Sequence, residues 1–341
     1  MKKGLFWNKV TFFVNSLMAF ALLFSYLLPY ISPKTTPSFT ILSLAVPVLF
    51  LVNLLFAIYW LVRLKKQFIL STIIIFLGFG YIGRIYKFSE KKTPQNEDLK
   101  VMSYNVKMFN HYGWNRKDSV DQNTYDFIND QKPDILSIQE FFEPKNFQIT
   151  YPYQYIKTKN KSNKFGLAIY SNYPIINSGS LDFKSSANNI IFADIVKEND
   201  TIRIYNVHLE SLKINTEKEN FGEENSDRLI KRMKTAFKKQ AAQTEQFLAH
   251  EKQWKGKKIV CGDFNNTAFS WVYRQISKNK QDAFVEAGKG FGKTFDYGYP
   301  LRIDFILADM NFDVNYFKTF DVKYSDHFPI LARLKLKESS K

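Results

Sequence analysis

The chain has 341 residues, enough for one large domain or two smaller ones, and 17% of them are aromatic, so a sizeable core is available. The formal charge of +16 suggests nucleic acid at first, but residues 1–93 carry +10 of it and the rest of the chain only +6. A single cysteine, Cys261, excludes a disulfide within the monomer.

Three uncharged apolar runs of 22, 28 and 17 residues occupy the N-terminal third, at 11–32, 35–62 and 67–83. A spanning helix needs roughly 20 apolar residues. We therefore predict a membrane domain over residues 1–87, with three transmembrane helices at about 11–32, 38–62 and 67–86. The alternative for the first run is a cleaved signal peptide. The length of the run and the absence of a small-residue cleavage site argue against that alternative. A buried soluble helix is the alternative for the third.

The lysines and arginines in the short loops predict the orientation. Three lysines precede the first run and three basic residues follow the second, whereas the first loop carries only Lys34. This pattern places the N-terminus in the cytoplasm and the C-terminal domain outside. We therefore expect an integral protein of a bacterial inner membrane with an extracytoplasmic C-terminal domain. The basic residues directly after the third run favour the opposite orientation, namely Arg84, Lys87, Lys91 and Lys92.

Residues 88–98 form a polar tether, and the C-terminal domain is expected at 99–338. Helices are predicted at 116–131 and, from apolar residues at helical spacing, at 225–252. Strand-like segments occur at 99–106, 133–140, 165–175, 189–198, 201–210, 257–264, 301–310 and 328–337. Many strands with few helices between them predict an α/β fold of two packed sheets flanked by helices.

Polar residues stand at or near the ends of several predicted strands, where side chains from different strands can meet in one pocket. These residues are Asn105, Glu140, His208, Asp263, Asn265, Asp304, Asp326 and His327. Most have a simpler interpretation as turn or cap residues, and the Asp-Phe-Asn-Asn run at 263–266 is also typical of a turn. Asp304 is the exception, because it interrupts an apolar strand and a buried carboxylate there needs a partner.

Seven short segments together resemble the endonuclease/exonuclease/phosphatase superfamily, which has the DNase I-like fold. They are SYNV (103–106), IQE (138–140), YSNYPI (170–175), NVHLES (206–211), GDFNNT (262–267), RIDFIL (302–307) and SDHFPI (325–330). Their order and approximate spacing match the family, and the resemblance covers about residues 99–338. It implies a four-layer α-β-β-α sandwich and a metal-dependent phosphoric ester hydrolase, here of a membrane-anchored bacterial type.

A phosphodiester resists hydrolysis because its anionic oxygens repel a nucleophile, so a site must neutralise charge and activate water. Oxygen donors suit Mg²⁺ or Mn²⁺. By residue type and by the resemblance, the candidate ligands are Asn105, Glu140 and Asp326. Asp263 is the candidate for orienting or deprotonating water. Asn265 can donate its amide hydrogens to a phosphate oxygen.

The resemblance also implies a catalytic His327 polarised by Asp304, since an Asp on one ring nitrogen fixes the tautomer and stabilises the imidazolium. His208 resembles a second histidine of the DNase I and sphingomyelinase branches. The DNase I branch pairs that histidine with a Glu in an earlier loop, and residues 160–165 contain no acid. Whether a histidine or Asp263 is the general base stays open. Arg302 is expected to bind substrate.

These features favour a membrane-anchored nuclease, with nucleic acid as the expected substrate. The mildly basic C-terminal domain, including Lys161 and Lys164, can hold a phosphate backbone. The alternative is a sphingomyelinase-like phosphodiesterase or phosphatase for a lipid headgroup or small phosphoester, which the membrane anchor favours. A non-catalytic scaffold is the third possibility, opposed by the full set of site residues. No protein partner is implied.

Overall fold

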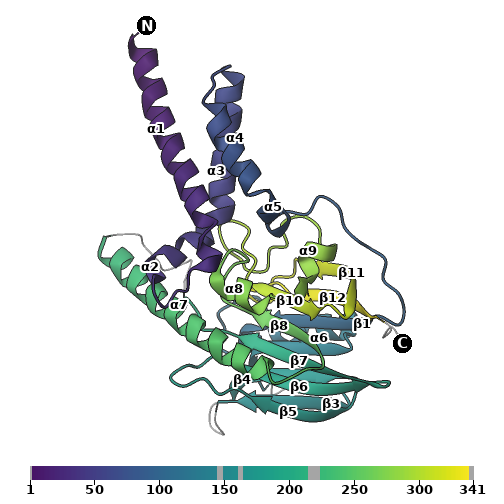
Figure 1. Cartoon of the computed structure of the whole chain (residues 1–341). Helices are drawn as coiled ribbons and strands as arrows, with labels where there is room; N and C mark the ends of the chain where they lie inside the picture. The colour runs from purple at the N-terminus through teal and green to yellow at the C-terminus, as the bar shows by residue number, and fades with distance from the viewer. Residues whose placement is uncertain (1, 144–148, 160–163, 214–222, 338–341) are drawn as a thin grey trace.

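The computed structural model describes residues 2–143, 149–159, 164–213 and 223–337. A bundle of N-terminal helices stands on a sandwich of two β-sheets (Figure 1). The bundle contains α1 (Lys2–Ser25), η1 (Leu28–Tyr30), α2 (Pro37–Thr40), α3 (Leu42–Val62), α4 (Phe68–Leu77) and α5 (Phe79–Ile85).

Two stretches, Leu5–Tyr30 and Leu42–Val62, are long and apolar enough to cross a membrane. The third predicted helix is not continuous. It divides into α4 and α5, which meet at an angle of 74°. Only the two helices together are long and apolar enough to cross a membrane. The break falls at Gly78, which lies so close to Tyr26 that a Cβ atom there would be 2.1 Å from the Tyr26 hydroxyl oxygen. The sequence pattern shows the apolar length of this segment but not this contact.

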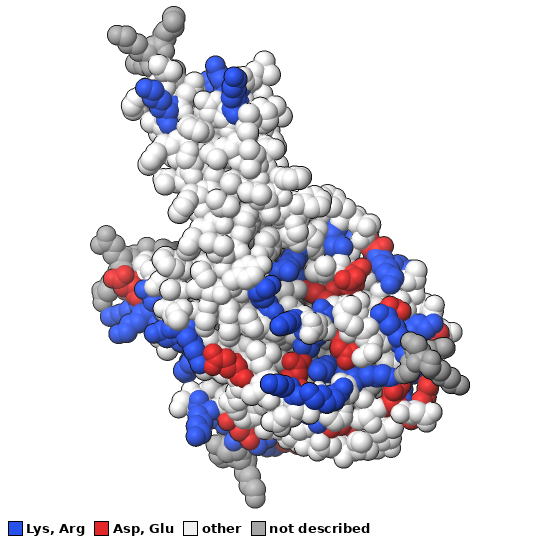
Figure 2. All heavy atoms as spheres, viewed as in Figure 1, with Lys and Arg blue, Asp and Glu red and all other residues white. Residues whose placement is uncertain are grey.

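A buried polar network joins α1, α3 and α4. The side-chain amide of Asn15 donates to Ser71 Oγ at 2.6 Å, and the indole of Trp60 donates to Asn15 Oδ1 at 2.9 Å. Ser71 in turn donates to Asn53 Oδ1 at 3.1 Å. Hydrogen bonds between small polar side chains fix the register of helices in an apolar bundle. On the face seen in Figure 2 the middle of the bundle shows no charged side chains, and Lys and Arg gather at its end far from the sandwich.

Within the described residues the sandwich consists of two six-stranded sheets. The first has the order β11 (Phe312–Thr319), β12 (Ile330–Leu336), β1 (Leu99–Asn105), β2 (Ile135–Phe142), β4 (Phe165–Ser171) and β3 (Tyr153–Thr158). The second has the order β5 (Ile175–Ser180), β6 (Asn189–Lys197), β7 (Asp200–His208), β8 (Lys257–Asp263), β10 (Asp304–Asp309) and β9 (Lys280–Asp282). The pairs β1–β2 and β7–β8 are parallel and the other pairs are antiparallel.

The described helices cover the outer faces of the two sheets. α6 (Val120–Gln131) packs on the first sheet through Ile128. α7 (Glu223–Glu251) and α8 (Trp271–Ile276) pack on the second through Phe247 and Val272. Two short elements, η2 (Lys107–Asn110) and α9 (Ala283–Ala287), complete the domain. The predicted four-layer α-β-β-α sandwich is confirmed.

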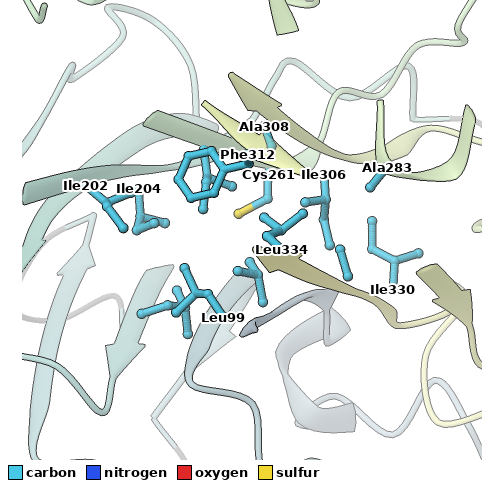
Figure 3. Packing of buried hydrophobic residues seen from close by; sticks show 14 of the residues in the cluster. Leu99, Ile202, Ile204, Cys261, Ala283, Ile306, Ala308, Phe312, Ile330 and Leu334 are labelled. Atoms are coloured by element: carbon cyan, nitrogen blue, oxygen red, sulfur yellow. The ribbon is translucent and has the colours of Figure 1, made fainter. Parts of the chain in front are cut away.

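The main core fills the space between the sheets (Figure 3). Leu99 and Leu334 of the first sheet belong to one buried cluster with Cys261 and Ile306 of the second. The prediction of a single strand at 165–175 is wrong, because β4 and β5 belong to different sheets. The chain crosses from one sheet to the other at residues 172–174, where Ser171 Oγ accepts from the backbone N–H of Tyr173 at 2.9 Å and so fixes the turn.

Candidate active site

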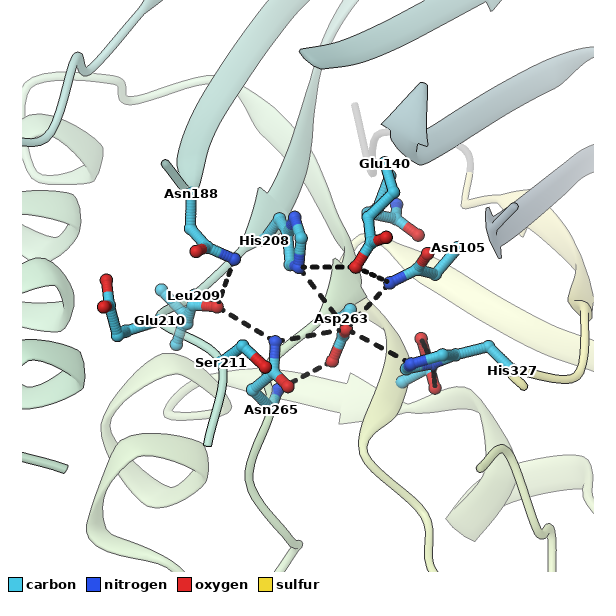
Figure 4. A network of polar contacts seen from close by, with 12 residues as sticks. Asn105, Glu140, Asn188, His208, Leu209, Glu210, Ser211, Asp263, Asn265 and His327 are labelled. Atoms are coloured by element: carbon cyan, nitrogen blue, oxygen red, sulfur yellow. Dashed lines mark hydrogen bonds and ion pairs between the residues drawn. The ribbon is translucent and has the colours of Figure 1, made fainter. Parts of the chain in front are cut away.

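The parallel strand pairs bring the polar strand ends together at one edge of the sandwich (Figure 4). His208 and Asp263 are paired residues at the ends of β7 and β8, and Asn105 ends β1. Gly262, with φ +135°, allows the two strands to approach here, because a Cβ atom would lie 2.0 Å from Val207 O. A glycine is therefore required next to Asp263, since an L-residue would clash and adopt a strained backbone.

Glu140 reaches the same edge through a β-bulge. The register of β2 against β4 shifts between Ile138 and Phe141, and Glu140 has φ 49°. Bulges of this kind redirect a side chain, and a non-glycine residue in the left-handed region is a strain typical of functional sites. The amide of Asn105 lies between two carboxylates, 3.4 Å from Glu140 Oε1 and 3.1 Å from Asp263 Oδ2.

Asp263 is the centre of the cluster and is fully buried. Its Oδ1 accepts the backbone N–H of Asn265 at 2.7 Å, and its Oδ2 accepts the amide of Asn105. The Nε2 atoms of His208 and His327 each lie 3.7 Å from Oδ2. Burial raises the pKa of Asp263 to about 7, against the lowering effect of His327. A carboxylate with this pKa can gain and lose a proton near neutral pH.

His327 and Asp304 form the predicted pair. Nδ1 of His327 lies 3.0 Å and 3.2 Å from the two carboxylate oxygens of Asp304. Burial alone would lower the pKa of His327, but Asp304 and Asp263 outweigh it and raise that pKa to about 10. The imidazolium therefore persists at neutral pH, with Nδ1 held by Asp304 and Nε2 directed towards Asp263.

His208 has the opposite character. Burial, with the charge of His327, lowers the pKa of His208 to about 3, so its ring is neutral at physiological pH. Among the described residues its Nε2 has no hydrogen-bond partner, although it lies 3.9 Å from Glu140 Oε1 and 3.7 Å from Asp263 Oδ2. Nε2 of His208 is therefore available for a hydrogen bond with a bound group at this point of the cluster.

Asp326 lies at the rim of the cluster. Its Oδ2 accepts from Lys107 Nζ at 2.6 Å, and Lys107 also lies over the ring of Trp114, 4.0 Å from its centroid. Burial raises the pKa of the Glu140 carboxyl, and the charge of Asp326 raises it further. Lys107 was not among the predicted site residues, although its position two residues after Asn105 was a usable signal.

The predicted contact of Asn265 with a phosphate oxygen is not available in this arrangement of the side chain. Both amide hydrogens of Asn265 have acceptors within the protein, Leu209 O at 3.0 Å and Asp263 Oδ2 at 3.2 Å. Donation to a phosphate would therefore require the Asn265 side chain to turn.

Arg302 is buried, and its NH1 donates to Asp282 Oδ2 at 2.7 Å. Its guanidinium lies over the rings of Phe284 and Phe305. The structure thus gives Arg302 a packing role and does not bring it to the cluster around Asp263. The segment 160–165, which lacks the Glu that pairs with the second histidine in the DNase I branch, is described only at residues 164 and 165. Lys161 also lies outside the described residues.

The donor set fits a divalent cation. Asp263, Asp304 and His327 offer ligand atoms within 4.8 Å of one another, while Asn105, Glu140 and Asp326 offer oxygens alone. Mg²⁺ and Mn²⁺ prefer oxygen donors, and Asp304 is already occupied by Nδ1 of His327. The charge of Asp326 raises the pKa of Glu140, and this repulsion between two carboxylates is the feature that a cation would relieve.

Comparison with known proteins gives two family matches. Residues 102–327 match the Endonuclease/Exonuclease/phosphatase family, and residues 8–85 match a domain of unknown function (DUF8431). No curated protein matches the chain significantly.

Among solved structures, a functionally unknown conserved protein from Enterococcus faecalis V583 is 18% identical, with a TM-score of 0.52, over 70% of this chain and all of that one. The human Nocturnin catalytic domain with bound sulfate is 17% identical, with a TM-score of 0.52, over 74% of this chain and 97% of that one. At these identities the two structures show a shared fold.

Proposed function

The chain belongs to the Endonuclease/Exonuclease/phosphatase family, and we propose that it hydrolyses phosphate esters with a divalent cation, Mg²⁺ or Mn²⁺, at the cluster around Asp263. Members of this family are hydrolases that act on phosphate esters. The observation that carries the proposal is the convergence of Asn105, His208 and His327 on one buried carboxylate with a pKa of about 7.

Glu140, Asn105 and Asp326 are the residues that would hold the cation. When bound, it would neutralise charge on the phosphate and lower the pKa of a water molecule. Support comes from the raised pKa of Glu140, which reflects repulsion by Asp326 as well as burial. Lys107 partly offsets that repulsion, because it forms an ion pair with Asp326 and its charge lowers the pKa of Glu140.

The protein's own groups account for the proton movements of the reaction. A water oxygen bonds to phosphorus, its proton passes to an Asp263 carboxylate oxygen, and the ester P–O bond breaks. His327 Nε2 gives a proton to the leaving oxygen, and Asp304 keeps the ring charged and oriented until then. Nε2 of neutral His208 has no partner among the described residues and can form a hydrogen bond with the water.

The substrate proposed from sequence is nucleic acid, with a lipid headgroup or small phosphoester as the alternative. A cavity of about 320 Å³ opens beside His208 and favours the alternative. Its lining is mostly polar and includes Ser186, Asn188, Asn189 and Lys157. This volume lies at the low end for ligand pockets and suits one compact polar group.

The proposed location is the bacterial inner membrane, with the catalytic domain outside the cytoplasm. The end of the bundle far from the sandwich is basic (Figure 2), as expected for a cytoplasmic end. Arg84 is one of the basic residues after the third apolar run that favour the opposite orientation. Its side chain donates to Ala268 O at 3.1 Å. Its position is explained by this contact with the catalytic domain, which weakens it as an orientation signal.

The experiment uses the full chain in detergent, with bis(4-nitrophenyl) phosphate as substrate and Mg²⁺ or Mn²⁺ compared with EDTA. We expect cation-dependent release of 4-nitrophenolate and a loss of at least about a hundredfold in kcat for Asp263→Asn. Asp309→Asn is the matched control, because Asp309 is also buried but holds backbone N–H groups away from the cluster. Equal turnover in EDTA, or an active Asp263→Asn variant, would refute the proposal.

A further inference from the structure

Three aromatic side chains on the loop before β10 lead away from the catalytic histidine. The ring of Phe295 lies against His327 with centroids 4.9 Å apart. Tyr297 stacks on Phe295 at 6.4 Å, and Tyr299 meets Tyr297 edge-on at 5.2 Å. All three are only partly buried. Together they make a continuous aromatic strip on the surface, which we call the 295–299 strip.

The far end of the 295–299 strip contacts the helical bundle. The Tyr299 hydroxyl donates to Leu44 O at 3.0 Å, and Leu44 is the third residue of α3. This end of α3 is the one that faces the sandwich (Figure 1). Tyrosine is enriched where a membrane meets water, so the residue type suits a surface that begins at the membrane boundary.

The loop that carries Asp263 is attached to the same end of α3. The Thr267 hydroxyl donates to Ser43 O at 2.9 Å. Phe269 is buried in a cluster with Ala19 and Leu22 of α1. The bundle therefore holds both the loop that follows Asp263 and the 295–299 strip, through the adjacent residues Ser43 and Leu44, which fixes the site relative to the bundle.

The reach from the site to the membrane boundary is short. α3 has 21 residues and is about 31 Å long, which matches a hydrocarbon core of about 30 Å, so the boundary lies near Leu42. Thr267 is four residues beyond Asp263, at most about 14 Å of chain. Asp263 is thus within about 20 Å of the boundary, and the headgroup layer occupies roughly the first 6 Å of that distance.

We propose that the substrate is a membrane-borne amphiphile, a phosphoester whose phosphate enters the site from the bilayer surface while its apolar part lies along the 295–299 strip. This inference rests on the proposed hydrolase function and names its substrate class. Stacked aromatics can also hold nucleic-acid bases. The contact of the strip with α3 and the compact polar cavity beside His208 favour the amphiphile.

The test compares two phosphodiesters with the same leaving group and the full chain reconstituted in phosphatidylcholine vesicles. Hexadecyl 4-nitrophenyl phosphate partitions into the vesicles, and methyl 4-nitrophenyl phosphate stays in solution. At equal bulk concentration we expect the hexadecyl ester to release 4-nitrophenolate at least about tenfold faster, because a shared bilayer raises the effective concentration. The advantage should vanish when the hexadecyl ester is supplied in separate vesicles.

A pair of tyrosine variants tests the strip itself. Tyr297→Ser should lower turnover of the hexadecyl ester about five- to tenfold, as expected for a lost aromatic contact, and should lower turnover of the methyl ester much less. Tyr153→Ser is the matched control, since Tyr153 is a partly exposed tyrosine on β3, and it should change neither rate.

The outcomes separate the two proposals. Equal rates for the two esters, or a Tyr297→Ser variant that affects both equally or neither, would overturn the inference while leaving the hydrolase intact. Faster cutting of an oligonucleotide than of the hexadecyl ester would do the same and would favour nucleic acid. No turnover of any of them would refute the hydrolase proposal, and the inference with it.

Discussion

Replacing Asp304 by Asn tests the role assigned to the His327 pair. The carboxylate of Asp304 lies 3.0 Å from Nδ1 of His327 and is the main group that raises its pKa to about 10. In Asp304→Asn the pKa of His327 should fall, because both the charge of Asp304 and its hydrogen bond to the ring are lost and burial lowers the pKa. The neutral ring can no longer protonate the leaving oxygen, so we expect kcat to fall by about a hundredfold or more at pH 8.

The same change has a stability signature with a definite sign. The pKa of His327 is raised in the folded state, so the pair stabilises the fold fully below about pH 6.5, the ordinary histidine pKa, and this contribution is lost as pH rises through about 10. Breaking a buried pair costs about 3 kcal/mol or more. The deficit in Tm of Asp304→Asn should therefore be largest in mild acid and shrink towards pH 10.

The assay is thermal unfolding of the full chain in detergent with EDTA, across this pH range, together with the pH profile of kcat. Asp282→Asn provides a comparison, because Asp282 forms a buried pair with Arg302, whose guanidinium does not titrate in this range. Its deficit in Tm should not decline towards pH 10 as that of Asp304→Asn does. A deficit for Asp304→Asn that is constant or grows with pH would refute the reasoning.

Three further predictions follow from buried contacts. Asp263→Asn should raise Tm in EDTA above pH 7 and not below pH 4, because the raised pKa of Asp263 makes its ionisation destabilising as pH rises from 3.8 through about 7; a lower Tm at pH 8 would contradict this. Gly262→Ala should cost about 3 kcal/mol or more, whereas Gly113→Ala, at φ +63° but in open space, should cost about 1 kcal/mol, both measured by thermal unfolding. Thr267→Val should lower Tm and kcat by removing the bond to Ser43 O, worth about 1 kcal/mol, and Thr267→Ser should retain both.

Part of the arrangement around Asp263 was predictable from sequence, because several of its residues stand at strand ends. Asn105 and Asp263 each end a strand next to a parallel neighbour. Their strands, β1 and β8, belong to different sheets, so the contact between the two residues depends on how the sheets pack. Asp304 was identified by its position inside an apolar strand, and its pairing with His327 followed from the resemblance and is seen in the structure.

Other features depend on contacts that no local pattern contains. Arg302 was predicted to bind substrate, but its partner Asp282 is known only from the packing of β9 against β10. The bend between α4 and α5 depends on the approach of Gly78 to Tyr26, which is 52 residues earlier in the chain. The bond from Thr267 to Ser43 joins residues 224 positions apart.

These long-range contacts also offer a reason for a bundle of several helices. A single helix would tether the domain but leave it free to rotate. Here Asn15, Ser71 and Asn53 join α1, α3 and α4 through buried hydrogen bonds, and the bundle in turn holds the catalytic loop through Thr267 and Phe269. A joint of this kind fixes the orientation of the site as well as its height above the boundary. Orientation matters for a substrate confined to the bilayer and little for one that diffuses in solution, so the bundle and the 295–299 strip are consistent with the same substrate class.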